Sequence, residues 1–204
     1  MRDVVIIGAG QAGLGISYCL KQQGVDHVIL EKGDIGRAWR EDRWDSFCLV
    51  TPNWTITLPG AEYAGDNPGG FMDRDDFVRH LEAWAKSFDA PLQTHTEVLS
   101  VNKSDAGFKL ETSAGPMEAQ RVVLACATYQ HPRMPGFAAA LDPGIQQVDA
   151  ARYRASAALP PGGVLVVGSG QSGCQIAEEL NRAGRKTALA VGDTGRLPRR
   201  YRGR

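Results

Sequence analysis

The sequence predicts an α/β fold in which parallel strands alternate with helices. Two observations carry this prediction: short apolar runs rich in β-branched residues, and a pattern of strand, glycine-rich turn and helix that occurs twice. The apolar runs at residues 4–7 and 164–167 have the length of strands, so neither is long enough to cross a bilayer.

The composition is that of a globular protein. The chain has 204 residues, of which 43% are hydrophobic and 23% charged, which is enough to bury a core and atypical of disorder. Its 23 Lys and Arg balance its 23 Asp and Glu, so net charge gives no reason to expect binding to nucleic acid or to a membrane. Widely spaced cysteines and an N-terminus that opens directly into a strand favour a cytoplasmic protein with reduced thiols and no metal site.

The most informative feature is an internal repeat. Residues 4–30 and 164–190 each contain a β-branched run, a glycine-rich turn, an amphipathic stretch, a terminating glycine and a second apolar run. This order predicts a strand, a helix and a second strand in each copy. The glycines of the two turns correspond one to one: Gly8, Gly10 and Gly13 in the first copy, and Gly168, Gly170 and Gly173 in the second.

Each triplet has the spacing G-x-G-x-x-G between a strand and a helix, which is typical of a Rossmann-like dinucleotide-binding unit. The first glycine permits the tight turn, the second lets a pyrophosphate approach, and the third lets helix and strand pack closely. A purely steric glycine turn is the alternative, and two copies in register disfavour it. The first site is expected to comprise Gly8, Gly10, Gln11, Ala12, Gly13, Glu31 and Lys32, and the second Gly168, Gly170, Gln171, Ser172 and Gly173.

The two copies differ where a ribose would bind. Glu31 ends the second strand of the first copy and can accept hydrogen bonds from ribose hydroxyls. The equivalent position of the second copy is Val191, and an arginine-rich segment with Arg196 and Arg199 follows it. Loss of the carboxylate and gain of arginine suit a 2′-phosphate, so the second site favours NADP. Asp193 is the counter-argument, and a solvated basic end is the alternative interpretation of the arginines.

The segment between the copies predicts a connection, a helix and a small sheet. Residues 32–70 show little helical periodicity and indicate an extended connection with functional loops. Residues 74–87 carry an aromatic and aliphatic stripe at helical spacing, which predicts an amphipathic helix with a buried stripe. Residues 92–125 alternate in short runs between turn signals, which predicts an antiparallel meander whose last run returns to the main sheet.

A proline-rich loop over residues 132–161 predicts a domain boundary. We expect a first dinucleotide-binding domain at residues 1–150 and the start of a second one at residues 151–204.

Four further motifs accompany the double fingerprint: RWDSFCLVTPNW at 43–54, GFMDRDDFVRHLEAWA at 70–85, ATYQHPRMPGF at 127–137 and PRRYRGR at 198–204. With them the chain resembles the flavin-containing monooxygenase superfamily over essentially its whole length, in particular bacterial oxidoreductases of the type that plant auxin-forming monooxygenases also resemble. The resemblance implies FAD on the first fingerprint and NADPH on the second. NADPH would reduce the flavin, O2 would give a C4a-hydroperoxide, and a small-molecule substrate would be oxygenated.

The resemblance also implies roles for single residues. Trp39 would lie along the flavin, and the backbone of Val98 would face the adenine. Asn53 matches an asparagine near the flavin and nicotinamide, where an amide can hydrogen-bond a peroxide intermediate without protonating it. A turn residue after Pro52 is the alternative interpretation. Ala127 lies in a turn that would run close to the FAD.

Three departures from the superfamily pattern stand out. Relatives carry Ala-Thr-Gly where this chain has Ala125-Cys126-Ala127, and an alanine at the last position obstructs a backbone with positive φ or crowds the ligand. A His and a Ser that precede the second fingerprint are replaced by Asp149 and Ala150, whereas Tyr153 persists. The sequence also stops before the segment that would complete the discontinuous first domain, so we expect an N-terminal portion that needs a C-terminal half or a homo-oligomer.

The leading interpretation is therefore an FAD- and NADPH-dependent oxidoreductase of the flavin monooxygenase type. The departures support an alternative, a non-catalytic or truncated FAD-binding protein. A flavin disulfide reductase is less favoured, because it needs a redox cysteine pair shortly after the first unit and only Cys48 is near.

Overall fold

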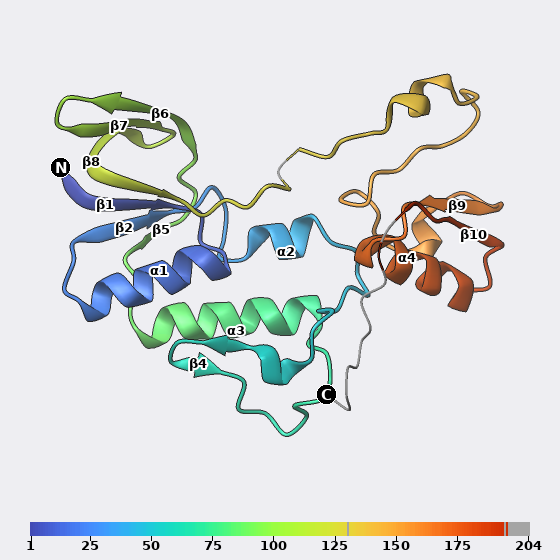
Figure 1. The fold of residues 1–204 in the computed structure, drawn as a ribbon, viewed down its shortest axis with the longest axis horizontal. Coiled ribbons are helices and arrows are strands. Elements are labelled where there is room, and N and C mark those ends of the chain that lie inside the picture. The colour runs from blue at the N-terminus through green and yellow to red at the C-terminus, as the bar shows by residue number, and fades with distance from the viewer. Residues whose placement is uncertain (130, 194, 196–204) are drawn as a thin grey trace.

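The computed structural model describes residues 1–129, 131–193 and 195. It contains a larger unit built on a six-stranded sheet and a smaller unit built on a two-stranded sheet, with a short helix lying between them (Figure 1). The larger unit comprises β1 (Arg2–Ile7), α1 (Gln11–Gln22), β2 (His27–Leu30), α2 (Arg37–Glu41), β3 (Thr57–Leu58), β4 (Ala61–Glu62), α3 (Arg74–Ser87), β5 (Leu92–Gln93), β6 (Val98–Ser104), β7 (Gly107–Thr112) and β8 (Gly115–Leu124). The smaller unit comprises β9 (Val164–Val167), α4 (Gln171–Arg182) and β10 (Thr187–Ala190).

The six-stranded sheet has the order β5-β2-β1-β8-β7-β6. The first four strands of this order are parallel, and β8, β7 and β6 form an antiparallel meander. Val5 of the central strand β1 lies opposite Val28 of β2 and Val122 of β8. The predicted α/β class, the meander and the return of its last run to the main sheet are thus confirmed.

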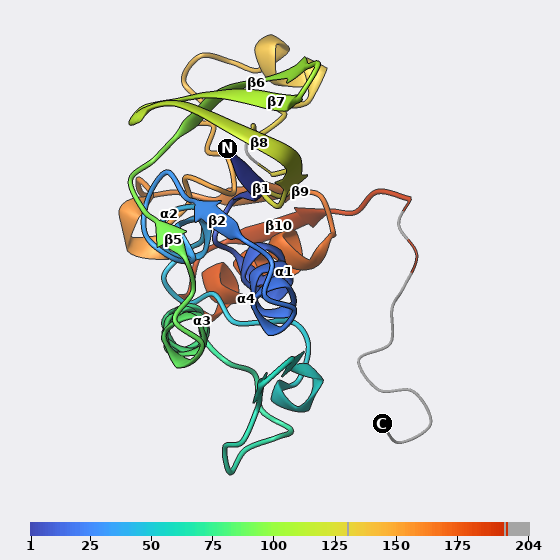
Figure 2. The same cartoon turned by 90° about the vertical axis from the view of Figure 1, so that its left-hand side faces the viewer.

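Both faces of the central strands are covered, as parallel strands require. On one face, Ile6 and Ile29 pack against Leu14 of α1 and Leu81 of α3. On the other face, Leu110 and other meander residues pack against the opposite side of β1 and β2. Figure 2 shows the meander above the parallel strands and helices α1 and α3 below them.

Helix α3 occupies the predicted range, and its apolar stripe is core as expected. Phe77, Leu81 and Trp84 are all buried. Asp73 caps the helix by accepting a hydrogen bond from the Asp76 N–H at 2.7 Å, and the acidic residues of the first turn suit the positive end of the helix dipole. Cap, charge and periodicity therefore agree, which explains why the sequence placed this helix correctly.

The smaller unit repeats the strand, helix and strand of the larger one. β9 and β10 pair in parallel, and Ile176 and Leu180 of α4 pack against Val164 and Val166 on one face of β9. The opposite face carries Leu165, which is 63% exposed, and Val167, which is 53% exposed. A parallel sheet is normally covered on both faces. In this two-stranded sheet, the described residues cover only the face that packs against α4.

A long loop joins the two units. It leaves β8, contains short 3-10 turns at Gly136–Ala140 and Ser156–Ala158, and reaches β9 (Figure 1). This matches the predicted loop-rich character of residues 132–161. Within the described residues, none of the helices combines the length and the apolar character of a membrane span.

The loop begins in a strained conformation. Ala127 has φ +57°, in the left-handed region that disfavours every residue with a Cβ. The expected conflict at this position is confirmed: the backbone keeps the conformation suited to glycine although the residue is alanine.

Replacing Ala127 by glycine should relieve this strain. We expect Ala127→Gly to raise the free energy of unfolding by up to about 1 kcal/mol, measured by denaturant titration. The matched control is Ala125→Gly, which should lower it, because Ala125 lies outside the left-handed region, so glycine there gains unfolded-state entropy and loses the packing of its Cβ against the core. Destabilisation by Ala127→Gly would contradict the assignment of strain.

Candidate functional site

The first glycine-rich turn lies at the carboxyl ends of β1 and β2. The Gly8 N–H donates to the Leu30 carbonyl at 2.8 Å, which ties the turn to the end of β2. Gly8 has φ +108°, and a Cβ there would lie 2.7 Å from the Ala125 carbonyl oxygen. The turn is therefore held between β2 and the chain leaving β8, and glycine is required at its first position.

The other two glycines of this turn serve different purposes. A Cβ on Gly13 would lie 1.9 Å from the Gly8 carbonyl oxygen, so the close packing of α1 on β1 excludes any side chain there. Gly10 begins α1 from an extended backbone with φ −85°, and no described atom lies within 4 Å of the place its Cβ would take. The fold therefore explains Gly13 but not Gly10, which leaves open space beside the helix N-terminus.

The N-terminus of α1 is suited to an anion. Among the described residues, no side chain caps this helix, and its first turn, which includes Gln11 and Ala12, contains no acidic residue. Gln11 and Ala12 are exposed. Free N–H groups and the positive end of the helix dipole therefore face the space beside Gly10.

Glu31 holds the turn in place. One carboxylate oxygen, Oε2, accepts a hydrogen bond from the Ala9 N–H at 2.8 Å, and Oε1 accepts one from the Gly33 N–H at 3.1 Å. Each oxygen can accept a second hydrogen bond, for example from a ribose hydroxyl. The sequence indicated the ribose role alone; the bond to Ala9, 22 residues away, was missed, because no local pattern signals it.

Two further predicted residues lie around Glu31. Lys32 follows it and is exposed. Val98 opens β6, two residues after Thr96, whose N–H donates to the Glu31 carbonyl at 2.8 Å. The structure thus brings the glycine-rich turn, Glu31 and the start of β6 to one edge of the sheet.

The second turn reproduces the first. The Gly168 N–H donates to the Ala190 carbonyl at 3.0 Å, and Gly168 has φ +105°. A Cβ on Gly173 would lie 1.9 Å from the Gly168 carbonyl oxygen, whereas no described atom lies within 4 Å of a Cβ on Gly170. Gln171 and Ser172 form the exposed first turn of α4.

The counterpart of Glu31 in this second unit is Val191, which is 70% exposed and has no carboxylate to brace the turn. Arg196 and Arg199 lie outside the described residues, so their contact with a 2′-phosphate stays a prediction.

Trp39 lies among aromatic side chains. Its ring meets Phe77 edge to face, with centroids 5.0 Å apart, and the Arg43 guanidinium stacks over it at 5.5 Å. Trp39 is half-buried, so part of its surface remains available to a ligand. Its predicted place along a flavin stays a prediction.

Asn53 begins a one-turn 3-10 helix directly after Pro52. It is 5% exposed, and its Nδ2 donates to the Asn67 carbonyl at 3.0 Å. Its Oδ1 is buried without a partner among the described residues. The side chain lines a hollow of about 510 Å³ together with Tyr63 and His80. Asn53 therefore offers one buried acceptor atom, whereas the contacts that are described do not link it to the glycine-rich turns.

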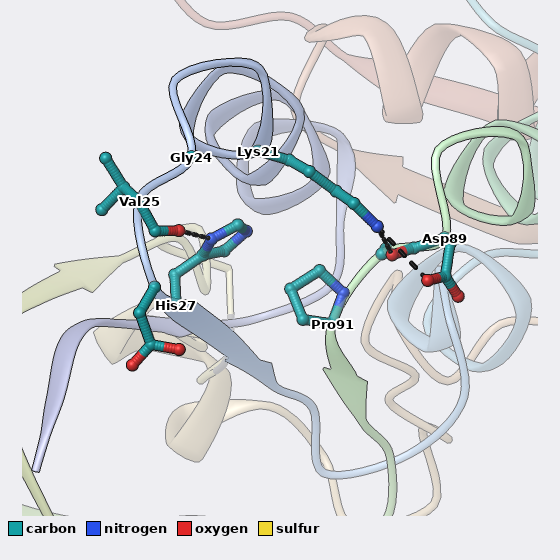
Figure 3. Close-up of a pocket in the computed structure, with 8 residues that line it drawn as sticks. Lys21, Gly24, Val25, His27, Asp89 and Pro91 are labelled. Carbon is teal, nitrogen blue, oxygen red and sulfur yellow. Dashed lines mark hydrogen bonds and ion pairs between the residues drawn. The ribbon is translucent and has the colours of Figure 1, made fainter.

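A second hollow, of about 380 Å³, lies at the opposite end of the sheet (Figure 3). The Lys21 Nζ donates to Asp89, and the His27 Nδ1–H donates to the Val25 carbonyl at 2.8 Å. The His27 Nε2 in turn accepts a hydrogen bond from the Ser17 hydroxyl at 2.8 Å. These polar groups satisfy one another at the amino ends of the strands, whereas ligands of parallel sheets bind at the carboxyl ends.

None of the four cysteines forms a disulfide bond. Cys48, the first cysteine in the sequence after residues 4–30, is half-buried. Among the described residues, no group of three or more His, Cys, Asp or Glu side chains could hold a metal ion.

Comparisons with known proteins agree with this geometry. A protein-family model described as pyridine nucleotide-disulphide oxidoreductase matches residues 5–202. A CzcO-like oxidoreductase of Geobacillus kaustophilus is 43% identical over 93% of this chain and 54% of its own length. The indole-3-pyruvate monooxygenase YUCCA1 of Oryza sativa subsp. japonica is 30% identical over 93% of this chain and 48% of its own length. The chain thus spans about half the length of the curated relatives it matches.

Solved structures show the same fold. A flavin-containing monooxygenase from Stenotrophomonas maltophilia superimposes with a TM-score of 0.83 at 25% identity, over 95% of this chain and 59% of that one. The bacillithiol disulfide reductase of Staphylococcus aureus superimposes with a TM-score of 0.79 at 18% identity, over 95% and 58%, a likeness of fold alone. The resemblance to flavin-containing monooxygenases is confirmed, and the chain belongs to the pyridine nucleotide-disulphide oxidoreductase family.

Proposed function

We propose that the chain binds FAD at its first glycine-rich turn and NADPH at its second, and that it acts in an oxidoreductase of the flavin monooxygenase type. One observation carries the proposal: two turns lie at the carboxyl ends of parallel strands, each tied by the same backbone hydrogen bond to the end of the next strand, and each leaves open space at its second glycine. Relatives named as monooxygenases support the type of reaction.

The first turn fits a dinucleotide with a free ribose. A pyrophosphate would occupy the space beside Gly10 and accept hydrogen bonds from the first N–H groups of α1. Glu31 would accept hydrogen bonds from ribose hydroxyls while it keeps its bonds to the turn. The start of β6, which includes Val98, would border the adenine, and Trp39 would lie along the flavin.

The second turn fits a dinucleotide that carries an additional phosphate. Gly170 leaves the same open space, and the exposed Val191 offers no carboxylate to repel a 2′-phosphate. Arg196 and Arg199 follow in the sequence and would supply the compensating positive charge.

The protein's part in catalysis is binding and orientation, because the bound flavin carries electrons between NADPH, O2 and substrate. The proposed catalytic residue is Asn53, whose buried Oδ1 would accept a hydrogen bond from a donor group near the flavin. An amide there orients a reactant without exchanging a proton with it. We further infer a small-molecule substrate and action in the cytoplasm, where free thiols are stable.

The two later glycines of the first turn allow binding and folding to be tested separately. Gly10→Val should abolish FAD retention after desalting while the unfolding midpoint stays near that of the wild type, because its side chain enters space the fold does not use. Gly13→Ala should instead prevent stable folding, because its Cβ overlaps the Gly8 carbonyl. FAD retained by Gly10→Val would show that the turn is structural alone.

Glu31→Ala should lower both FAD affinity and stability. We expect FAD binding to weaken by about 1–3 kcal/mol, measured by fluorescence titration, through lost ribose hydrogen bonds. The thermal midpoint of the FAD-free chain should also fall, because the Ala9 and Gly33 N–H groups lose their acceptor. An unchanged midpoint in the FAD-free variant would contradict the bracing role.

The reaction type is tested by anaerobic mixing of the FAD-loaded chain with NADPH, followed by admission of oxygen. Bleaching of the flavin absorption by NADPH, at a lower concentration than NADH requires, would support the proposal. Gly170→Val is the matched control and should retain FAD but lose the response to NADPH. FAD binding without bleaching, in this chain and in one extended at its C-terminus, would instead favour a non-catalytic FAD-binding protein.

A further inference from the structure

The two units meet through an apolar contact. Trp44 and Phe47, from the segment after α2, pack against Tyr153, Ile176 and Leu180 from the joining loop and α4. Trp44 and Phe47 meet edge to face, with ring centroids 5.0 Å apart. Segments more than 100 residues apart therefore share one apolar core. Figure 1 shows the chain after α2 running to α4.

A single carboxylate collects hydrogen bonds at this contact. Glu179 of α4 accepts one from the Tyr153 hydroxyl at 2.7 Å and one from the Ser156 N–H at 3.2 Å, both through Oε1. Its Oε2 accepts a hydrogen bond from the Ser46 hydroxyl of the larger unit. Three donors from two distant segments thus converge on one side chain of the helix that carries the second glycine-rich turn.

Tyr153 is itself fixed in this contact. It is 4% exposed, and burial together with the hydrogen bond to Glu179 raises its pKa above the usual value for tyrosine. The hydroxyl therefore stays protonated and donates to the carboxylate.

Backbone contacts continue the same boundary. The Asp45 N–H donates to the Arg154 carbonyl at 2.9 Å, and the Arg154 guanidinium donates to the Arg43 carbonyl at 3.1 Å. On α4, the Gln175 Nε2 donates to the Cys48 carbonyl at 3.2 Å. These bonds lie on both sides of Ser46, next to its hydrogen bond with Glu179. We call the hydrogen bonds of residues 43–48 with Arg154, Gln175 and Glu179 the polar seam.

The joining loop contributes the Arg154 hydrogen bonds but few buried apolar side chains. Within its described part, Ala138 and Tyr153 are its buried hydrophobic residues. Gly170 precedes α4 and Glu179 lies near the end of this helix. Because a helix is rigid, the position of the Glu179 carboxylate also determines how the second glycine-rich turn is oriented relative to the larger unit. An error of about 1 Å in the approach of two reactants is enough to slow a reaction strongly.

We propose that Glu179 is a positioning residue: by binding the Tyr153 and Ser46 hydroxyls and the Ser156 N–H, it fixes α4 and the second glycine-rich turn against the larger unit. Its effect on electron transfer rests on the proposed function; its effect on the arrangement of the two units does not.

The arrangement can be measured through native cysteines. Cys19 on α1 and Cys174 on α4 are exposed and belong to different units, so nitroxide labels on them report the separation of the units by pulsed electron paramagnetic resonance, in a Cys48→Ser, Cys126→Ser background. We expect one narrow distance distribution in this background. Glu179→Gln and Tyr153→Phe should broaden or shift it.

The matched control is Glu178→Gln, which makes the same change one residue earlier, where the carboxylate pairs with Arg182 on the exposed side of α4. It should leave the distribution unchanged. Equal distributions for Glu178→Gln and Glu179→Gln would overturn the proposal. If Glu179→Gln lost helix content by circular dichroism, Tyr153→Phe would decide, because it keeps the carboxylate and the buried ring.

A kinetic measurement distinguishes a role of Glu179 in positioning the second glycine-rich turn from a role in stabilising the fold alone. In the FAD-loaded chain, Glu179→Gln should slow flavin reduction at saturating NADPH by about tenfold or more, while the dissociation constants of FAD and NADPH stay within about twofold. An unchanged reduction rate would overturn the positioning role in electron transfer. If NADPH did not reduce the flavin of the FAD-loaded wild-type chain, the proposed function would be refuted. The distance measurement alone would then test whether Glu179 fixes the arrangement of the two units.

Discussion

The contact between α1 and β1 at Gly13 determines where the candidate site lies. The Gly8 carbonyl would be only 1.9 Å from a Cβ at Gly13, so the helix can start at the carboxyl edge of the sheet only if that position has no side chain. This contact directs the free N–H groups of the helix toward the space beside Gly10. The same constraint recurs at Gly173 and Gly168, which is why the chain has two glycine-rich turns with open space beside the second glycine.

Around this shared geometry, the two units differ in what surrounds the turn. In the larger unit, Glu31 joins the turn to the loop after β2, and both faces of the sheet are covered. In the smaller unit, Val191 replaces that brace, and one face of β9 is exposed. The smaller unit is instead supported from the side, through the seam at Glu179. The first glycine-rich turn is thus held by residues of its own unit, whereas the orientation of the second turn depends on contacts with the larger unit.

The sequence predicted most of the fold because its signals are local. The repeat of glycine-rich turns, the stripe of Phe77, Leu81 and Trp84, and the turns of the meander each depend on residues close together in the chain. The candidate site was only partly predictable. The spacing of the glycines and the carboxylate of Glu31 indicated a dinucleotide and separate roles for Gly10 and Gly13, and the distances around the two glycines agree with those roles.

What the sequence could not supply are contacts between distant segments. Ser46 and Glu179 are 133 residues apart, and nothing in either local pattern predicts their pairing. The second hydrogen-bonding role of Glu31, and an Asn53 Oδ1 without a partner among the described residues, likewise depend on the packed chain. The strain at Ala127 was an intermediate case: comparison with the superfamily pattern pointed to the position, and the φ of +57° confirmed it.

Two separate dinucleotide sites with different preferences are the basis of the proposed function. Isothermal titration calorimetry of the 204-residue chain with FAD, repeated in the presence of saturating NADP+, tests it most directly. The structure predicts one FAD per chain with an affinity that NADP+ does not reduce, because each ligand would occupy its own turn. Competition between the two ligands, or no FAD binding at all, would contradict the account.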